Sequence, residues 1–152
     1  MADVFSKSQR SFNMSRIGSK NTQPELLIRR ALFAQGFRYR LHQNNLPGRP
    51  DLVFKKYRAV IFINGCFWHY HQCRLSKLPG TRTQWWKKKL EGNSKRDQQN
   101  IEKLLGLGWR VLVIWECAWR GKGSVKEILP EISKTIAGWL KSNLSKLEIP
   151  EH

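Results

Sequence analysis

Ten residues in the middle of the chain, NGCFWHYHQC at 64–73, hold two cysteines, two histidines and three aromatic rings. Cysteine and histidine are characteristic zinc ligands in proteins. The third cysteine of the chain ends a strand that is predicted to lie beside this segment. A tetrahedral set of four ligands results: Cys66, His71, Cys73 and Cys117. Because such a set leaves no open position for a substrate, it is typical of structural zinc.

Two alternatives to this zinc site remain open from the sequence. The spacing C-x4-H-x-C is uncommon among zinc-binding motifs, so the three cysteines could instead be buried free thiols. His69 could also replace His71 as the fourth ligand, or it could stay available for proton transfer. The two histidines would share a face only if the segment were extended.

Carboxylates are scarce in this sequence, because 11 Asp and Glu accompany 28 Lys and Arg. Asp51 follows Pro50 at the start of a predicted strand, where the strand end would present its carboxylate at an edge of the sheet. Glu25 and Asp97 are predicted in the first turns of two helices. Acids at those positions also complement the helix dipole, so their positions alone do not establish a chemical role.

The positive charge is concentrated in the first two thirds of the chain. The net charge is +17, and residues 1–100 hold 20 Lys and Arg against 5 Asp and Glu. A polyanion is the natural partner of such a surface, and seven tryptophans accompany the charge. We therefore expect binding to nucleic acid, with basic residues such as Lys87, Lys88 and Lys89 neutralising phosphates.

The chain lacks the usual signs of export or membrane insertion. No stretch approaches the roughly 18 uninterrupted apolar residues of a membrane span, and residues 1–20 contain no apolar signal-peptide core. An odd number of cysteines argues against a disulfide-stabilised secreted protein. We expect a soluble, cytoplasmic protein of bacterial type with no membrane partner.

The predicted elements indicate an α/β domain. Three strands in a row followed by a helix and another strand favour a mixed sheet with helices on both faces. Helices are predicted at 21–37, 94–108 and 124–142, the last with a break or kink at Pro130, and strands at 37–42, 51–54, 58–64 and 109–117. Residues 1–20 are a basic arm, either a disordered tail or a segment that becomes ordered on DNA. Residues 21–152 form a single domain.

A Pro-Asp at a strand start with a second strand downstream is the skeleton of the restriction-endonuclease-like fold. The second strand of that fold usually carries an acid, a spacer and a lysine, whereas this chain has FIN at 62–64. A wider set of motifs resembles the very short patch mismatch-repair DNA endonucleases (Vsr). These motifs are SFNMSRI (11–17), LPGRPD (46–51), VIFINGCFWHYHQC (60–73), TRTQWW (81–86), GNSKRD (92–97) and GWRVLVIWECA (108–118).

The resemblance implies a restriction-endonuclease-like fold with structural zinc, and a magnesium-dependent nick in duplex DNA beside the thymine of a T·G mismatch. Asp51 would bind magnesium together with the backbone carbonyl of Ile63. His69 would activate water, Asp97 would orient or stabilise that histidine, and Glu25 would assist at the metal-bound water. The zinc ligands would be the four already named.

The resemblance also implies how DNA is bound. Phe67, Trp68 and Trp86 would enter the base stack beside the mismatch, and Met14 and Ile17 would approach from the minor groove. Zinc would fix both ends of the 64–73 segment so that its rings point outward. Core packing of the same rings is the alternative. We expect a monomer that cooperates with mismatch-repair proteins.

One position departs from the family pattern, because residue 64 is often a histidine there and is asparagine in this chain. An asparagine can form hydrogen bonds but cannot transfer protons near neutral pH. Two other functions also fit the sequence. One is a zinc-stabilised DNA-binding module without cleavage, and the other is a restriction nuclease that cuts both strands of matched DNA, which a dimer would favour.

Overall fold

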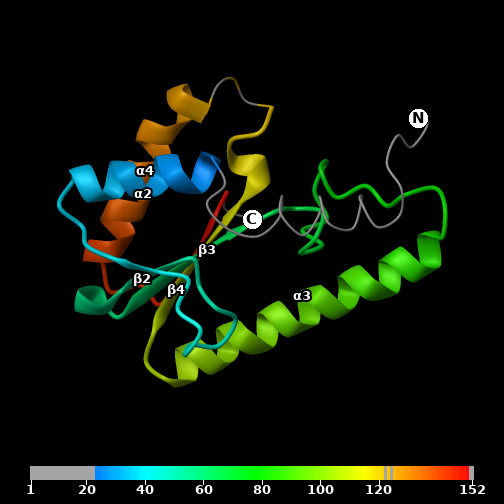
Figure 1. Ribbon diagram of the computed structural model, residues 1–152, viewed down its shortest axis with the longest axis horizontal. Helices are drawn as coiled ribbons and strands as arrows, with labels where there is room; N and C mark the ends of the chain where they lie inside the picture. The colour runs from blue at the N-terminus through cyan, green and yellow to red at the C-terminus, as the bar shows by residue number, and fades with distance from the viewer. Residues whose placement is uncertain (1–22, 122, 124, 151–152) are drawn as a thin grey trace.

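The computed structural model in Figure 1 describes residues 23–121, 123 and 125–150. The predicted arm at 1–20, with Met14 and Ile17, lies outside these residues. The helices are α2 (Gln23–Ala34), α3 (Thr83–Gly106) and α4 (Val125–Lys141), and two short 3-10 helices lie at Lys55–Tyr57 and Glu116–Ala118. The strands are β1 (Arg40–Leu41), β2 (Leu52–Phe54), β3 (Ala59–Asn64), β4 (Arg110–Trp115) and β5 (Lys146–Ile149).

The strands form one mixed sheet in the order β1-β2-β3-β4-β5. The first three strands pair antiparallel, whereas β3, β4 and β5 pair parallel. The parallel register of β3 and β4 aligns Asn64 with Trp115. These two strands therefore end side by side, and the residues that follow them meet at one edge of the sheet.

Helices cover both faces of this sheet, as the sequence predicts. In Figure 1, α2 and α4 lie on one side of the strands and α3 lies on the other. Two buried clusters reflect this arrangement, since side chains alternate across a strand. Leu52, Ile61 and Leu112 pack in the cluster with α2 and α4. Val60 and Val111 pack in the cluster with α3.

Helix α3 is longer than predicted, because it includes the basic, Trp-rich segment before residue 94. Leu90 is fully buried, and burying a leucine contributes about 1.5–3 kcal/mol. That contribution exceeds the roughly 1 kcal/mol cost of Gly92 inside a helix. Ser94 is therefore no helix cap, and Asp97 lies in the middle of α3 rather than in a first turn. The helix-dipole interpretation of Asp97 is wrong.

Three further predictions of secondary structure need correction. The strand predicted at 37–42 is reduced to β1, and α4 continues through Pro130, so the predicted break there is wrong while a kink stays a prediction. Strand β4 ends at Trp115, so Cys117 lies in the following 3-10 helix. Strand β5 was not predicted because its sequence, KLEI, has no long apolar run, and pairing with β4 stabilises it.

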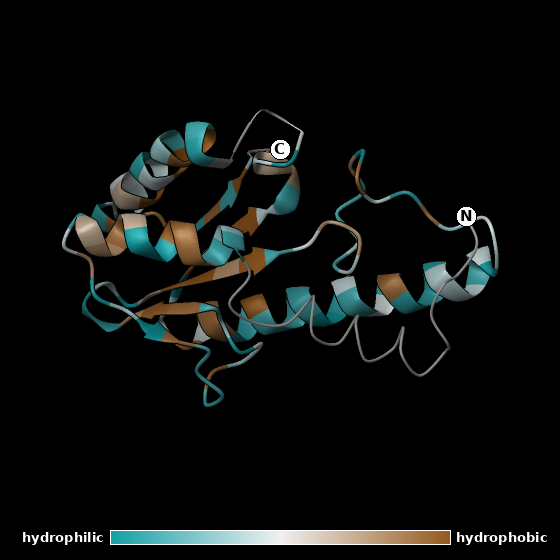
Figure 2. Ribbon diagram, turned by 45° about the horizontal axis from the view of Figure 1, so that its top comes forward, coloured by the Kyte–Doolittle hydropathy of each residue, from teal (hydrophilic) through white to brown (hydrophobic). Residues whose placement is uncertain are grey.

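Apolar residues concentrate along the strands in Figure 2, whereas α3 is largely hydrophilic with apolar positions at intervals. This pattern fits a helix that packs on the sheet along one side only. Among the described residues, no helix combines the length and the apolar character that crossing a membrane requires.

Candidate active site and metal centre

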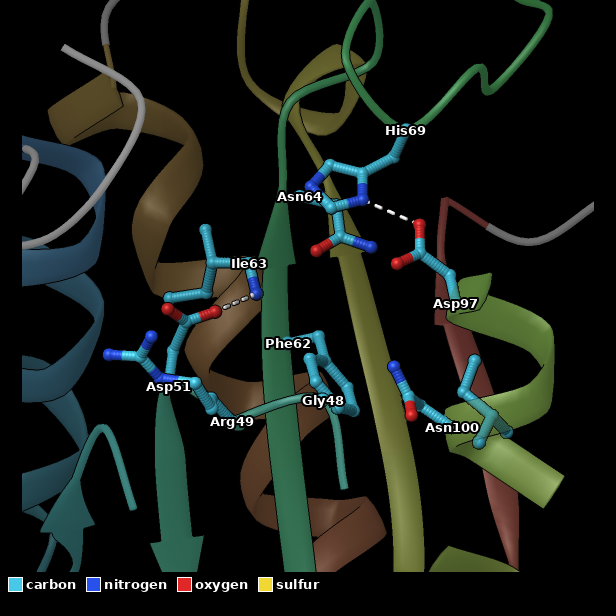
Figure 3. A pocket seen from close by; sticks show the side chains of 10 residues that line it. Gly48, Arg49, Asp51, Phe62, Ile63, Asn64, His69, Asp97 and Asn100 are labelled. Carbon is cyan, nitrogen blue, oxygen red and sulfur yellow. Dashed lines mark hydrogen bonds and ion pairs between the residues drawn. The ribbon is translucent and has the colours of Figure 1, made fainter. Parts of the chain in front are cut away.

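Three of the four predicted catalytic residues, all except Glu25, line a cavity of about 150 Å³ where β3 ends. Asp51 comes from the start of β2, His69 from the turns after β3, and Asp97 from α3. Figure 3 shows Asp51 on one side of β3 and the His69–Asp97 pair on the other. The lining residues are Gly48, Arg49, Asp51, Phe62, Ile63, Asn64, His69, Asp97, Asn100 and Ile101.

Asp51 is held as a partly buried carboxylate beside β3. Its Oδ2 accepts a hydrogen bond from the backbone N–H of Ile63 at 2.7 Å, and its side chain is 18% exposed. The pKa of Asp51 is raised from 3.8 to about 7, mainly by burial; the neighbouring Glu25 carboxylate adds to the rise, and the Ile63 hydrogen bond opposes it. A cation at this carboxylate would favour the ionised form, so the environment of Asp51 suits a metal ligand.

Glu25 is more than a residue that complements the helix dipole. It is only 2% exposed, and its carboxylate lies 3.7 Å from the Arg29 guanidinium. Its Oε1 also lies 3.4 Å from Nε2 of His42. One ligand atom from each of Glu25, His42 and Asp51 lies within 4.8 Å of the others. The structure therefore brings Glu25 to the Asp51 side of the cavity, together with a histidine that the sequence analysis did not identify.

His69 and Asp97 form a close pair on the other side of the cavity. Nδ1 of His69 lies 2.6 Å from Oδ2 of Asp97, and the two side chains are 33% and 28% exposed. A carboxylate at this distance favours the tautomer in which Nδ1 carries the proton, which leaves Nε2 free to accept one. Asn64 is buried at the end of β3 and lies directly beside His69 in Figure 3.

The three cysteines and His71 lie close together. Their ligand atoms all lie within 4.8 Å of one another, and Nδ1 of His71 is 3.6 Å from Sγ of Cys66 and 3.5 Å from Sγ of Cys117. His71 rather than His69 thus accompanies the cysteines. Residues 69 and 71 diverge because the segment turns, with left-handed backbone at Tyr70 (φ 52°). These four residues could together hold a metal ion.

The thiols of this site differ in their acidity. Burial raises the pKa of Cys66 and of Cys117. Burial also acts to raise the pKa of Cys73, but hydrogen bonds from the Leu75 N–H and neighbouring side chains outweigh it, and the pKa is lowered. The raised values show that two thiolates are poorly stabilised by the protein alone. Without a cation these two thiols stay protonated, and a bound metal ion would favour their thiolate forms.

The predicted DNA-contacting rings form a cluster of their own. Phe67 lies 5.1 Å from Trp68 and 5.6 Å from Trp86 between ring centroids, and the two tryptophans are 5.9 Å apart. All three are half-buried, and none belongs to the two core clusters described above. Contact of these rings with DNA stays a prediction, with core packing as its alternative. Lys89 is exposed on α3 nearby, with its Nζ 5.6 Å from the Trp85 ring.

Comparison with known proteins identifies the family to which this chain belongs. The family model described as DNA mismatch endonuclease Vsr matches residues 2–75. The chain is 49% identical over 122 residues to DNA mismatch endonuclease Vsr of Escherichia coli K12, which covers 80% of this chain and 78% of the relative. The chain belongs to the Vsr family. Its α/β fold is therefore restriction-endonuclease-like.

Two type II nicking enzymes are also similar to this Vsr-family chain. V.NmeAIP of Neisseria meningitidis is 43% identical over 136 residues, which is 90% of this chain and 97% of the relative. V.XorIIP of Xanthomonas oryzae pv. oryzae is 43% identical over 132 residues, which is 87% of this chain and 97% of the relative. Relatives named as mismatch endonucleases and as nicking enzymes thus both match over most of the chain.

Sequence reasoning missed several residues that support this Vsr-family site. The ring of Trp115 stacks on His71, with centroids 4.0 Å apart and an interplanar angle of 6°. Oε1 of Glu116 accepts a hydrogen bond from the Cys66 N–H at 3.3 Å. Both residues directly precede Cys117 in the sequence, and this position next to a predicted metal ligand could have identified them. His42 gave no such signal, because its neighbours in the site are distant in sequence.

Proposed function

We propose that this protein is a strand-specific DNA mismatch endonuclease that hydrolyses the phosphodiester bond beside the thymine of a T·G mismatch. The observation that carries the proposal is the His69–Asp97 pair, at 2.6 Å, which shares one cavity with the Asp51 carboxylate. A general base and a metal-binding carboxylate in one cavity suit hydrolysis of a phosphodiester. The base activates water, and the cation that the carboxylate binds places positive charge at the phosphate. Membership of the Vsr family supports the same reaction.

His69 is the proposed base that removes a proton from the attacking water. Asp97 accepts the Nδ1–H hydrogen bond, so Nε2 of His69 carries the lone pair that takes the proton. The same carboxylate stabilises the imidazolium that results, by direct charge interaction at short range. Asn64 does not titrate near neutral pH and would orient groups by hydrogen bonds rather than transfer protons.

Asp51 and the backbone carbonyl of Ile63 are the proposed magnesium ligands, and Glu25 would hold a water molecule of the hydrated ion. These oxygen ligands match the preference of magnesium for carboxylates, carbonyls and water. Magnesium bound there would neutralise charge on the phosphate and on the leaving oxygen. The hydrogen bond from the Ile63 N–H keeps the Asp51 carboxylate oriented before the ion binds.

Zinc is the metal that best fits the Cys/His site. A tetrahedral zinc has Zn–S bonds of about 2.3 Å and Zn–N bonds of about 2.0 Å, which places a sulfur and a nitrogen ligand about 3.5 Å apart. His71 Nδ1 lies 3.6 Å and 3.5 Å from the sulfurs of Cys66 and Cys117. Bound zinc would join the 64–73 segment to the end of β4, which fixes His69 beside the cavity. Its role would be structural, because all four positions are filled by the protein.

The cluster of Phe67, Trp68 and Trp86 is the proposed mismatch-recognition surface. Inserting such rings between base pairs costs a few kcal/mol of unstacking, and a mismatched pair opens more easily than a matched one. General affinity for DNA would come from lysines, including Lys87, Lys88 and Lys89, which are all exposed on α3. Met14 and Ile17 remain predicted minor-groove contacts of an arm at 1–20 that becomes ordered on DNA.

The remaining parts of the proposal concern organisation and partners. Residues 21–152 would form a single endonuclease domain that acts as a monomer in the bacterial cytoplasm, together with mismatch-repair proteins. The substrate would be double-stranded DNA, and the basic surface of the first 100 residues supports this partner.

Strand-labelled duplexes test the proposed reaction directly. One set contains a matched duplex, a T·G mismatch and other mismatches, each with and without magnesium. The proposal predicts one nick beside the thymine of the T·G duplex, only with magnesium. Binding without any cleavage would favour the DNA-binding module, and cutting of both strands of the matched duplex would favour a restriction nuclease.

A further inference from the structure

His42 has no part in the mechanism above, yet it lies against Asp51, which lines the cavity, and against Glu25. The antiparallel pairing of β1 with β2 places it there. Leu41 pairs with Leu52, and the backbone N–H of His42 donates a hydrogen bond to the Asp51 carbonyl at 3.2 Å. The first turn of α2 then brings Glu25 to the same point. Three separate elements thus contribute one cluster.

The imidazole of His42 lies between the two carboxylates. Its Nδ1 is 3.7 Å from Oδ1 of Asp51, and its Nε2 is 3.4 Å from Oε1 of Glu25. Nε2 is buried and has no hydrogen-bond partner among the residues that the structure describes. A buried polar atom is normally satisfied by a partner. An atom of this kind among two acids therefore indicates that something else occupies the site in the working protein.

A divalent cation suits all three groups, with Asp51 and His42 as direct ligands and Glu25 holding a water molecule of the ion. One ligand atom from each residue lies within 4.8 Å of the others, which is the spacing that a shared ion requires. The charge also fits, because two carboxylates and an imidazole lone pair offer negative charge and electron density to a single cation. Oxygen ligands suit both magnesium and manganese, whereas an added imidazole favours transition-metal ions over magnesium.

We propose that His42 is a nitrogen ligand of the divalent cation that Asp51 binds, and that this site therefore binds Mn²⁺ more tightly than Mg²⁺. The inference rests on the proposed function, because it concerns the same cation. It adds a ligand and a metal preference that oxygen ligands alone would not give. A hydrogen-bonded bridge between Glu25 and Asp51, with no contact to the metal, is the alternative role of His42.

Pulsed electron paramagnetic resonance of bound Mn²⁺ separates these two roles, because it detects nitrogen that is bonded directly to the ion. The intact protein is used with its Cys/His site loaded and without DNA. The parent should show imidazole nitrogen coupling, and ¹⁵N-labelling of histidine should change that coupling without any mutation. The coupling should disappear in His42→Gln and persist in His69→Gln, which is the matched control at the histidine that lines the cavity.

Binding measurements give a second readout. Loss of an outer-shell partner weakens a metal site by about 10–100-fold, so loss of the imidazole itself in His42→Gln should weaken Mn²⁺ binding by at least tenfold. Mg²⁺ binding should change less, because the amide oxygen remains an acceptable ligand for a hard ion. The preference of the parent for Mn²⁺ over Mg²⁺ should therefore shrink by a similar factor.

Three results would overturn the inference: no nitrogen coupling in the parent, coupling that is lost in His69→Gln instead, or an unchanged metal preference in His42→Gln. Circular dichroism checks that each variant is folded. If a variant does not fold, the ¹⁵N-labelled parent still decides the test, because it needs no mutation. Nicking by the parent is measured separately. A parent that nicks T·G duplexes but lacks the coupling refutes only this inference. A parent with the coupling that does not nick refutes only the proposed function.

Discussion

Replacing Asp51 with asparagine should stabilise the magnesium-free protein, although it removes the proposed metal ligand. The pKa of Asp51 rises from 3.8 to about 7, mainly because of burial. Each tenfold change in an equilibrium corresponds to about 1.4 kcal/mol, so keeping this carboxylate ionised in the folded protein costs at most about 4 kcal/mol. In Asp51→Asn the amide oxygen can still accept the hydrogen bond from the Ile63 N–H.

The sign of the pH dependence follows from the raised pKa. Below about pH 4 the carboxyl is protonated in both the folded and the unfolded chain, so the cost is absent. Between about pH 4 and pH 7 the unfolded chain ionises while the folded one does not, and the cost grows. Above about pH 7 the full cost is present. Asp51→Asn should therefore gain stability over the parent as pH rises through this window.

Urea denaturation at pH 5 and pH 8, in buffer without magnesium, measures the effect. The free energy of unfolding of Asp51→Asn minus that of the parent should be about 2–3 kcal/mol larger at pH 8 than at pH 5, by the linkage relation. Glu102→Gln, which removes an exposed carboxylate from α3, controls for the change in net charge. Added magnesium at pH 8 should stabilise the parent but not Asp51→Asn. No gain, or an equal gain in Glu102→Gln, would refute the reasoning.

Three other substitutions test separate parts of the site. Cys117→Ser should lose the bound metal and lower the melting temperature, since a structural metal contributes to folding, and a metal-loaded variant with an unchanged melting temperature would contradict this. Asp97→Asn should slow nicking by about 10²–10⁴-fold with DNA affinity retained, because His69 loses its orienting partner, so a near-normal rate would remove Asp97 from the mechanism. Trp68→Ala should reduce the ratio of T·G to matched affinity by about 10–100-fold without changing the salt dependence of binding. An unchanged ratio with a lowered melting temperature would make Trp68 a packing residue.

The metal centre could be predicted from the sequence largely because of two strands. The runs VIFIN and VLVIW are too apolar for anything but strands buried on both faces, and a helical connection between them favours parallel pairing. The three cysteines follow these strands, so the sheet brings them together. The choice between His69 and His71 depended on the local turn after Cys66, which spacing alone does not determine.

The rest of the site depends on contacts that no periodic pattern in the sequence predicts. His42 reaches Asp51 through a two-residue strand and a turn-rich connection, and such a short strand carries no alternation to recognise. The continuity of α3 was missed for a related reason. Gly92 and Ser94 are typical of a boundary, but the burial of Leu90 and Leu104 on either side of them keeps the helix intact. Tertiary packing overrides local preference at both places.

Single-turnover nicking of a strand-labelled T·G duplex by the parent and by Asp51→Ala tests the central assignment most directly. The account predicts that the parent nicks the thymine strand in magnesium, and that Asp51→Ala binds the same duplex with similar affinity but nicks at least about a hundredfold more slowly, the scale on which loss of one electrostatic stabiliser acts. Near-normal nicking by Asp51→Ala would contradict the placement of the catalytic metal at this carboxylate.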